Sequence, residues 1–396
     1  MRIVDSTTGE LVPAAAGDTA TLYVCGITPY DATHLGHAAT FVTFDLLHRA
    51  WLDQGLSVRY ASNVTDVDDP LLDRAREIGM DWTRLAAEQT ELFAQDMTAL
   101  GVLAPHVYLG AVETIPLVAD AVRRILDLGL AYRVPLEAGA GGADPGLGDV
   151  YATLGTDLAG LDRDEVLALF AERGGDPDRP GKRDPLDPAL WRRERPGEPA
   201  WDGGALGSGR PGWHIECTVI AQSALGEGFD VAGGGRDLCF PHHAMSADHA
   251  RALGGTGARA HMHVGMVAYE GEKMSKSLGN LVLVSRLVAD GVEPGAIRLA
   301  ILAHHYATDW EFTTDLLEEA GDQLRRWRTA LSGNGGPDAA STVAAMRAAL
   351  ANDLDAPAAL RAVDEWATTA RTLGGAVEGA PGVLARAIDA LLGVRI

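Results

Sequence analysis

The sequence predicts an α/β fold: a Rossmann-like parallel sheet interrupted by an inserted region and followed by helices. Three observations predict this fold class. A strand, a helix and a second strand follow one another over residues 21–64, the strand–helix pattern returns at 228–250, and helical periodicity dominates from residue 294 onward. Parallel strands connected by helices place a ligand crevice at the carboxyl ends of the strands. The segments that directly follow the strands are therefore the first candidates for a functional site.

The first strand–helix–strand unit has the clearest pattern. Residues 21–25 (Thr-Leu-Tyr-Val-Cys) form a short apolar run that ends in a Gly-Ile-Thr-Pro turn. Apolar side chains then recur at helical spacing over 36–54, and Gly55 suits the end of that helix. Residues 57–64 have the composition of the next strand. A unit of this kind implies two parallel strands with the helix packed between them.

The middle of the chain is less regular. Helical patterns cover 81–100 and 111–129, whereas 137–148 are rich in Gly, Ala and Pro and predict a loop. Residues 174–212 contain many Gly, Pro, Asp and Arg with little periodicity, so we interpret them as part of an insertion. The expected domains are the first half of the catalytic nucleotide-binding domain (1–105), an inserted connective region (106–210), the second half of the catalytic domain (211–290), a helical stem (291–335) and a short helical C-terminal domain (336–396).

The composition predicts a globular, enzyme-sized protein with an acidic surface. The chain has 396 residues, 47% of them hydrophobic, and a formal net charge of -22. Because nonspecific nucleic-acid binding depends on Lys and Arg that neutralise phosphates, this charge argues against a polynucleotide substrate, although a local basic groove is compatible with the same total. Three cysteines do not make a disulfide framework, and the sequence shows neither a secretory leader nor 18 consecutive apolar residues. We expect a cytoplasmic monomer without membrane contact.

The first motif with chemical potential is His-Leu-Gly-His at residues 34–37, which follows the first strand and opens the first helix. The amino end of a helix carries unpaired N–H groups and the positive end of the dipole, so it binds anions. Gly36 lets a nucleotide approach the backbone, and His34 and His37 can contact phosphate oxygens and stabilise charge that develops there. A tetrapeptide of this kind also occurs for purely structural reasons, so it needs support from elsewhere in the chain.

A second motif supplies that support. Residues 273–277 (Lys-Met-Ser-Lys-Ser) place two ammonium groups and two hydroxyls on a short stretch, followed by Leu-Gly-Asn. Such a loop can close over a triphosphate and offset charge on the departing diphosphate. In this order, the two motifs resemble the signature of class I aminoacyl-tRNA synthetases. That resemblance implies catalytic roles for His34, His37, Lys273 and Lys276.

Four further stretches narrow the resemblance. They are 25–31 (Cys-Gly-Ile-Thr-Pro-Tyr-Asp), 63–69 (Asn-Val-Thr-Asp-Val-Asp-Asp), 211–217 (Pro-Gly-Trp-His-Ile-Glu-Cys) and 233–243 (Gly-Gly-Gly-Arg-Asp-Leu-Cys-Phe-Pro-His-His). In this order they resemble cysteinyl-tRNA synthetase over residues 20–290. The resemblance implies one zinc ion bound by Cys25, Cys217 and His242. Spacing alone does not show this set, because the residues lie far apart in the sequence.

The chemistry of zinc fits the implied site. Zinc with three protein ligands and an open position is the catalytic arrangement, and a substrate thiolate can take that position because zinc favours sulfur. In the synthetase a Glu four residues after the zinc histidine is a further ligand, and this chain has Ser246 there. We therefore expect three protein ligands, with Ser246 or water left open as the fourth. The alternative is that Cys25 and Cys217 are small buried apolar residues.

Several features depart from the synthetase pattern and point away from tRNA. His37 stands where the synthetase commonly has Asn, and Pro70 stands where it commonly has Lys. Only 119 residues follow Ser277, which leaves little room for an anticodon-binding domain. Residues 331–396 contain five Arg, no Lys and seven acidic residues, a formal charge of -2 that is poorly suited to tRNA.

Residues 25–37, 172–177 (Glu-Arg-Gly-Gly-Asp-Pro) and 211–217 resemble a paralogous family, the cysteine ligases of mycothiol biosynthesis, and this likeness extends along nearly the whole chain. The resemblance implies activation of L-cysteine by ATP with Mg²⁺ and transfer from cysteinyl-adenylate to the amine of glucosaminyl-myo-inositol, releasing AMP and diphosphate. The alternatives are a shortened cysteinyl-tRNA synthetase and a catalytically silent paralogue that binds cysteine or zinc. The intact motifs argue against the silent paralogue.

Carried over residue by residue, the resemblance implies a cysteinyl-adenylate site formed by Cys25, Gly26, Ile27, Thr28, Thr40, Asn63, Val64, Thr65, Trp213, Gly235, Arg236, Asp237 and Val267. Trp213 lies one helical turn before Cys217, so both can face the same pocket. Asp237 follows three glycines and precedes His242 by five residues, which makes it our candidate base for the transfer step. The alternative is that this carboxylate only fixes the loop or binds the cysteine ammonium.

Overall fold

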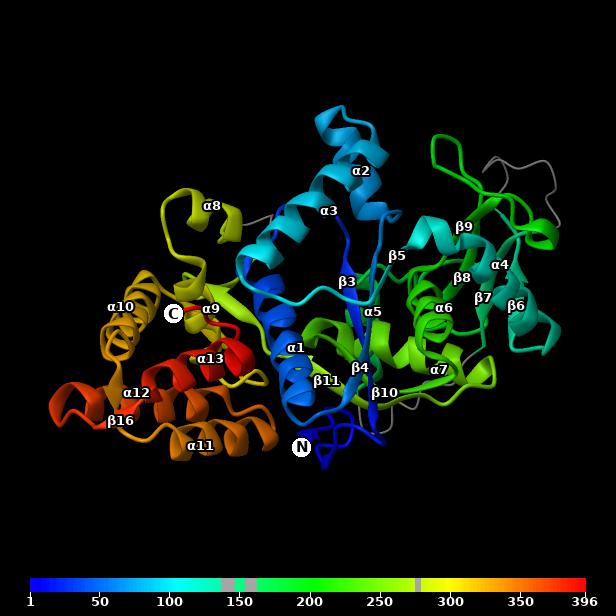
Figure 1. Cartoon of the computed structure of the whole chain (residues 1–396). Helices are drawn as coiled ribbons and strands as arrows, with labels where there is room; N and C mark the ends of the chain where they lie inside the picture. The colour runs from blue at the N-terminus through cyan, green and yellow to red at the C-terminus, as the bar shows by residue number, and fades with distance from the viewer. Residues whose placement is uncertain (137–146, 154–161, 275–278) are drawn as a thin grey trace.

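The computed structural model describes residues 1–136, 147–153, 162–274 and 279–396. At its centre is a five-stranded sheet in the order β11-β10-β3-β4-β5, and every neighbouring pair is parallel. The strands are β3 (Thr19–Ile27), β4 (Ser57–Val64), β5 (Val107–Gly110), β10 (Gly228–Gly235) and β11 (Gly257–Val264). This sheet confirms the predicted fold class (Figure 1).

Helices connect these strands and the inserted region. They are α1 (Leu35–Asp53), α2 (Asp69–Ile78), α3 (Trp82–Ala99), α4 (Ala111–Asp127), α5 (Arg163–Glu172), α6 (Trp213–Leu225) and α7 (Ala244–Ala252), with short helical turns η1 (Gly204–Leu206), η2 (Arg236–Leu238) and η3 (Cys239–His243). The helices predicted over 36–54, 81–100 and 111–129 correspond to α1, α3 and α4. The sequence prediction missed α2, which is short and begins at the Asp-Pro pair after β4.

Helices α1 and α6 cover opposite faces of the parallel sheet. Because side chains alternate along a strand, neighbouring residues of β3 point to different faces. Leu22 and Val24 belong to the same apolar core as α1, whereas Tyr23 and Cys25 pack with buried residues of α6. The strand therefore presents Cys25 to the α6 side of the sheet, where the second part of the chain lies.

The inserted region contains an antiparallel sheet of its own, in the order β6-β7-β8-β9 (Figure 1). Its strands are β6 (Ala131–Val134), β7 (Asp149–Ala152), β8 (Ala189–Arg193) and β9 (Gly209–Pro211). Sequence patterns did not indicate β8 and β9, because each strand is too short to show alternation and Gly and Pro surround both. Most of the loop predicted over 137–148 lies outside the described residues. The domain boundaries stay predictions.

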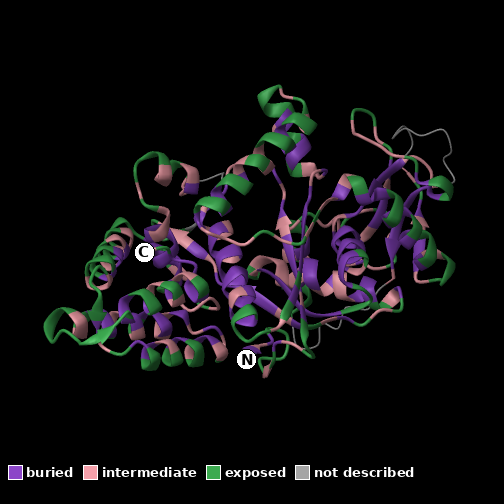
Figure 2. Cartoon of the chain, in the orientation of Figure 1, coloured by how far each residue is buried: buried purple, intermediate pink, exposed green. Residues whose placement is uncertain are grey.

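The remaining elements extend the core away from the inserted region. They are β1 (Arg2–Val4), β2 (Leu11–Pro13), β12 (Val267–Tyr269), β13 (Glu272–Lys273), β14 (Trp310–Phe312), β15 (Gly335–Gly336) and β16 (Val377–Glu378), with helices α8 (Val284–Ala289), α9 (Pro294–Leu302), α10 (Thr314–Leu331), α11 (Ala340–Ala351), α12 (Ala356–Thr372) and α13 (Ala380–Leu392). Buried residues of α9 to α13 belong to the same apolar core as α1. Figure 2 shows the buried parts of these helices in purple. Among the described helices, none combines the length and the apolar character needed to span a bilayer.

Candidate functional site

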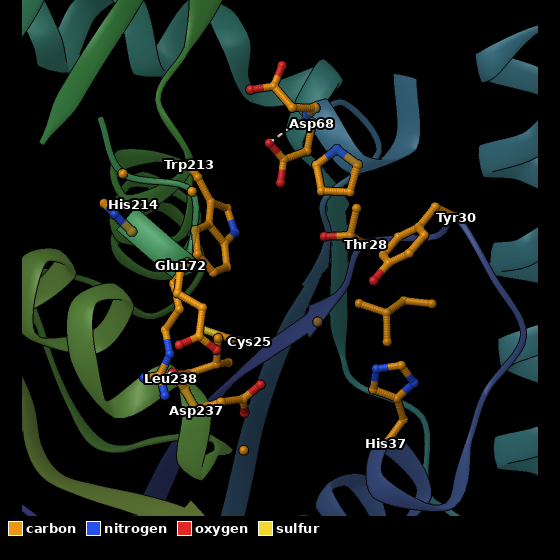
Figure 3. A pocket seen from close by; sticks show the side chains of 18 of the residues that line it. Cys25, Thr28, Tyr30, His37, Asp68, Glu172, Trp213, His214, Asp237 and Leu238 are labelled. Atoms are coloured by element: carbon orange, nitrogen blue, oxygen red, sulfur yellow. Dashed lines mark hydrogen bonds between the residues drawn. The ribbon is translucent and has the colours of Figure 1, made fainter. Parts of the chain in front are cut away.

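A cavity of about 690 Å³ opens at the carboxyl ends of the parallel strands, where the sheet meets the inserted region. Its lining includes the turn after β3, the start of α1, the start of α2, the end of α5 and the start of α6. Figure 3 shows side chains from these elements facing one another across the pocket. This is the place where open parallel sheets bind their ligands.

The two histidines of the first motif lie at one end of this cavity. His34 caps the amino end of α1, and its Nδ1 accepts a hydrogen bond from the Gly36 N–H at 3.1 Å. The rings of His34 and His37 stack with their centroids 3.9 Å apart. A Cβ on Gly36 would lie only 2.8 Å from the His34 ring, so glycine makes this packing fit. Two imidazoles at a helix start that faces a cavity suit phosphate oxygens.

The turn after β3 is shaped by a contact with β4. A Cβ on Gly26 would lie 1.5 Å from the carbonyl oxygen of Asn63, so no other residue fits there. The Asn63 Oδ1 accepts hydrogen bonds from the Gly26 N–H and the Tyr23 hydroxyl, both at 2.9 Å, and its Nδ2 donates to Thr65 Oγ1 at 3.2 Å. Asn63 is fully buried. Asn63 therefore fixes the turn after β3 without lining the cavity itself.

Cys25, Cys217 and His242 come together next to the cavity, and Cys25 is the member of this cluster that lines it. One donor atom from each lies within 4.8 Å of the other two, and all three residues are buried. The His242 Nε2 is a buried atom with no hydrogen-bond partner within the described residues, whereas its Nδ1 lies 3.0 Å from the Nδ1 of His214. An unpaired buried nitrogen is costly, and two thiols with an imidazole are a donor set that fits zinc. The three side chains form a candidate metal centre.

The two thiols of this centre have opposite pKa shifts. The hydrogen bond from Cys25 lowers the pKa of Cys217 well below its usual value, more than offsetting the effect of burial, and the nearby His242 lowers it further. The same contact, together with burial, raises the pKa of Cys25. Because a metal binds the thiolate form, the lowered pKa favours Cys217 as a ligand.

Neighbouring side chains orient this cluster. The Nε2 of His243 lies 3.2 Å from Cys25 Sγ, and its Nδ1 lies 2.7 Å from His263 Nε2, so His243 links Cys25 to His263. The Trp213 ring stacks on His242 with centroids 4.2 Å apart. The hydroxyl of Ser246 donates to the carbonyl oxygen of His214 at 3.0 Å. Ser246 is therefore already engaged by the backbone.

The structure separates the sequence-derived site residues into two groups. Those that line the cavity are Cys25, Gly26, Ile27, Thr28, His34, His37, Thr40, Trp213, Gly235, Asp237 and Val267. Those that do not are Asn63, Val64, Thr65, Cys217, Arg236 and His242. Arg236 instead pairs with Asp309 at 2.8 Å. The backbone of Lys273 lies in β13, and Lys276 lies outside the described residues.

One wall of the cavity was missed by sequence reasoning. It is formed by the start of α2 and by the inserted region, and includes Asp68, Asp69, Pro70, Asp73, Phe170, Glu172, Arg173, Gly174, Gly175, Asp176, Pro188, Ala189, Arg192 and Arg210. The stretches 63–69 and 172–177 stood out in the sequence, but nothing in them assigned a role to their charged residues. We call this set the inserted wall, and the set contributed by β3, α1, α6 and β10 the sheet wall.

Ion pairs organise the inserted wall. Asp69 pairs with Arg192 at 2.5 Å and also with Arg210. Burial alone would raise the pKa of Asp69, but the two guanidinium groups outweigh burial and lower it. For the adjacent Asp68, burial dominates and raises the pKa to about 6. The pKa values of these two neighbouring carboxyls are thus shifted in opposite directions, because only Asp69 forms ion pairs with arginines.

The fold and the site together define a class of protein. The family model of the class I tRNA synthetase (C) catalytic domain matches residues 12–322, and the chain belongs to this family. A parallel sheet with stacked histidines at its first helix and a Cys/Cys/His cluster beside them agrees with that membership.

Individual relatives are much more similar. A protein of Sanguibacter keddieii named L-cysteine:1D-myo-inositol 2-amino-2-deoxy-alpha-D-glucopyranoside ligase is 64% identical over 409 residues, which cover 100% of this chain and 96% of the relative. Proteins with the same name from Cellulomonas flavigena and Streptomyces avermitilis are 62% and 57% identical, each covering 100% of this chain and 96% of the relative.

Solved structures agree on the fold. The methionyl-tRNA synthetase of Mycobacterium tuberculosis in complex with methionyl-adenylate superposes with a TM-score of 0.65 at 15% identity, covering 95% of this chain and 88% of that one. A putative arginyl-tRNA synthetase from Campylobacter jejuni gives a TM-score of 0.59 at 12% identity, covering 96% and 94%. At these identities the likeness concerns the fold alone.

Proposed function

We propose that this protein activates L-cysteine with ATP and transfers it to the amine of glucosaminyl-myo-inositol, with release of AMP and diphosphate. The observation that carries the proposal is the position of the Cys25, Cys217 and His242 cluster beside a cavity whose other end holds His34 and His37. The reaction named for the relatives, which match along the whole chain at 64% and 62% identity, supports the same conclusion.

The cysteine side chain would be recognised at the metal centre. Cys25, Cys217 and His242 would hold one Zn²⁺, which supplies a preference for a thiolate over a hydroxyl when it is bound. Trp213, stacked on His242, would form the wall beside the cysteine side chain. Serine lacks the sulfur that this donor set selects, so binding at this corner would discriminate against it without an editing step.

The nucleotide would occupy the end of the cavity near α1. The cysteine carboxylate attacks the α-phosphorus of ATP, which forms cysteinyl-adenylate and expels diphosphate. His34 and His37 would contact the phosphates at the start of α1, and Lys273 and Lys276 would offset the negative charge of the leaving diphosphate. Gly235 and Val267 line the cavity where the adenosine would lie.

The amine would then attack the carbonyl carbon of the adenylate and expel AMP, while its proton passes to a base. Asp237 is our candidate, because its carboxylate lines the cavity and Figure 3 shows it on the same side as Trp213. Small molecules would be the only substrates, nucleic acid would not take part, and the protein would act as a cytoplasmic monomer.

One assay tests this proposal against the runner-up, a shortened cysteinyl-tRNA synthetase. Purified protein is supplied with ATP, Mg²⁺ and cysteine, and AMP release is measured with glucosaminyl-myo-inositol or with tRNA specific for cysteine. We expect acceptor-dependent AMP release with the amino sugar and none with tRNA. Transfer to tRNA alone would replace the ligase by the synthetase, and no cysteine-dependent diphosphate exchange at all would indicate a silent paralogue.

A further inference from the structure

The segment from residue 172 to residue 176 has no part in the reaction described so far. It comprises the last residue of α5 and the turn that follows, and all five of its residues line the cavity. It belongs to the inserted region, whereas the metal donors and the histidines of α1 belong to the sheet domain. The segment therefore faces the reacting groups from the opposite side.

Two glycines give this segment its shape. Gly174 has a φ of +87°, in the left-handed region that side chains other than glycine rarely adopt. A Cβ on Gly175 would lie 2.6 Å from the ring of Phe170, so the backbone packs directly against that ring. The glycine pair thus turns the chain back on α5 and keeps the end of the helix at the cavity.

Arg173 and Asp176 anchor the segment at two points. The Nη1 of Arg173 donates to the carbonyl oxygen of Asp237 at 2.7 Å and also to that of Phe240. These carbonyls belong to η2 and η3, the turns that carry Asp237 and His242. Asp176 accepts a hydrogen bond from Tyr151 and pairs with Lys182 at 3.0 Å. The end of α5 is therefore tied directly to the turn that bears the candidate base.

Glu172, unlike Arg173 and Asp176, does not anchor the segment. Its exposed side chain forms no hydrogen bond or ion pair with any described residue, and it lines the cavity. In Figure 3 the Glu172 side chain stands between Trp213 and Asp237, on the side opposite Thr28 and His37. A carboxylate that faces the cavity without such a partner among the described residues offers a charged acceptor to a bound ligand.

The other carboxylates of the inserted wall are less available. Asp69 is paired with two arginines, Asp176 with Lys182, and Asp73 with Arg76. Asp68 accepts a hydrogen bond from the backbone N–H of Asp69 at 2.8 Å and caps α2. Glu172 is thus the carboxylate of this wall with neither a cationic partner nor a capping role within the described chain.

We propose that Glu172 binds the ammonium group of the amino-sugar acceptor and positions it next to Asp237. The bound ammonium loses one proton to solvent to become the attacking amine, and Asp237 takes the second proton from its nitrogen as the amide forms and AMP leaves. This inference rests on the proposed function and adds the residue that recognises the acceptor. The anchors explain why the position of Glu172 is fixed: Arg173 ties it to Asp237 on one side, and Asp176 ties it to the inserted sheet on the other. A charge-assisted hydrogen bond gives an ammonium group an advantage over a neutral hydroxyl.

The test compares two variants of the zinc-loaded enzyme in steady-state transfer to glucosaminyl-myo-inositol. Glu172→Gln should raise the KM for the acceptor about 10-fold to 100-fold with a smaller change in kcat, because glutamine still accepts a hydrogen bond but no longer carries the charge that pairs with the ammonium. Glu165→Gln changes an exposed glutamate in the first turn of the same helix, outside the cavity, and serves as the matched control. It should leave the acceptor KM unchanged.

A second measurement asks whether charge is what Glu172 recognises. The analogue that carries a hydroxyl in place of the amine should inhibit transfer competitively. Its Ki should be nearly equal for the unaltered enzyme and for Glu172→Gln, although the KM for the amine differs strongly between them. Equal losses for both molecules would overturn recognition of the ammonium group.

Two further outcomes would overturn the role of Glu172 while leaving the proposed function intact. One is an unchanged acceptor KM in Glu172→Gln, and the other is a raised KM for cysteine in ATP–diphosphate exchange, which would place Glu172 on the cysteine ammonium. Failure of the proposed function has a different signature. The unaltered enzyme would then exchange diphosphate with cysteine but transfer nothing to the amino sugar.

Discussion

The two walls of the cavity hold their polar side chains by different means. On the sheet wall, Cys25 and Cys217 are 7% and 3% exposed. The turn after β3 is fixed by steric fit, because Gly26 packs directly against the carbonyl oxygen of Asn63 in β4. On the inserted wall, Asp69 keeps 47% of its side chain exposed and is held by two arginines. One wall depends on fixed geometry and the other on charge.

This difference indicates what each wall is suited to bind. Buried donors in fixed positions suit a metal ion and the reacting atoms, because small displacements there cost large factors in rate. Partly exposed, paired charges tolerate adjustment and suit a hydrophilic acceptor that must enter and leave. We therefore expect substitutions on the sheet wall to have large effects on the reaction, and substitutions on the inserted wall to have smaller and more selective effects.

The largest effect is expected at the candidate metal centre. Cys217→Ala removes the thiol with the lowered pKa, so the purified variant should contain little zinc and show no measurable cysteine-dependent ATP–diphosphate exchange. Changes in the residues around a metal already cost roughly 10-fold to 100-fold, and loss of a ligand should cost more. Metal analysis and the exchange assay measure the result. Cys239→Ala, a cysteine outside the cluster, is the control, and full zinc occupancy in Cys217→Ala would contradict the ligand assignment.

Lys276→Ala should have the next largest effect. Its charge is needed when diphosphate leaves, and the loss of one such electrostatic contact costs on the order of 10²–10³ in rate. ATP–diphosphate exchange should fall by this factor, while transfer from preformed adenylate should change much less. An exchange rate equal to that of the unaltered protein would remove Lys276 from adenylate formation.

Asp237→Asn tests the place where the two walls meet. If Asp237 is the base, single-turnover transfer from preformed adenylate should slow by about 10², whereas adenylate formation should change less. Both steps are followed by rapid quench. Equal slowing of both steps would instead make Asp237 a binding residue and place the base elsewhere.

The smallest effects, of opposite sign, are expected for the two adjacent carboxyls of the inserted wall. The lowered pKa of Asp69 means that its contribution to stability is present above pH 3.8, the unfolded value, and is lost as the pH falls through the native value. Asp69→Asn should therefore destabilise the protein at pH 7, by about 1 kcal/mol because the pair is partly exposed. Urea unfolding from pH 7 downward measures this.

Asp68→Asn is the matched counterpart. The native pKa of about 6 lies above the unfolded value, so the native state gains stability from this group as the pH falls through 6 toward 3.8. Asn keeps the capping role, so Asp68→Asn should leave the protein equally stable or more stable at pH 7 and flatten this part of the profile. Destabilisation by both variants at pH 7 would show that pairing does not distinguish the two carboxyls.

Sequence patterns predicted the sheet wall better than the inserted wall for physical reasons. The first strand–helix–strand unit is long and apolar enough to show the periodicities of its strands and helix. The histidines of the first motif lie where its first strand is followed by the helix. By contrast, β8 and β9 have too few residues to alternate, and the pairing of Asp69 with Arg192 and Arg210 depends on residues more than 100 positions apart. The cysteine cluster came from family resemblance, since no local spacing joins its members.

The order of strands in the parallel sheet also bears on how the protein is made. The residues of the candidate metal centre come from both sides of the inserted region, so Cys25 meets Cys217 and His242 only after the chain has been built through His242. At typical rates of synthesis this takes roughly 10 to 40 s. During that interval a nascent chain on the ribosome carries Cys25 without Cys217 and His242, so the candidate metal centre cannot form before the second half of the sheet has been made.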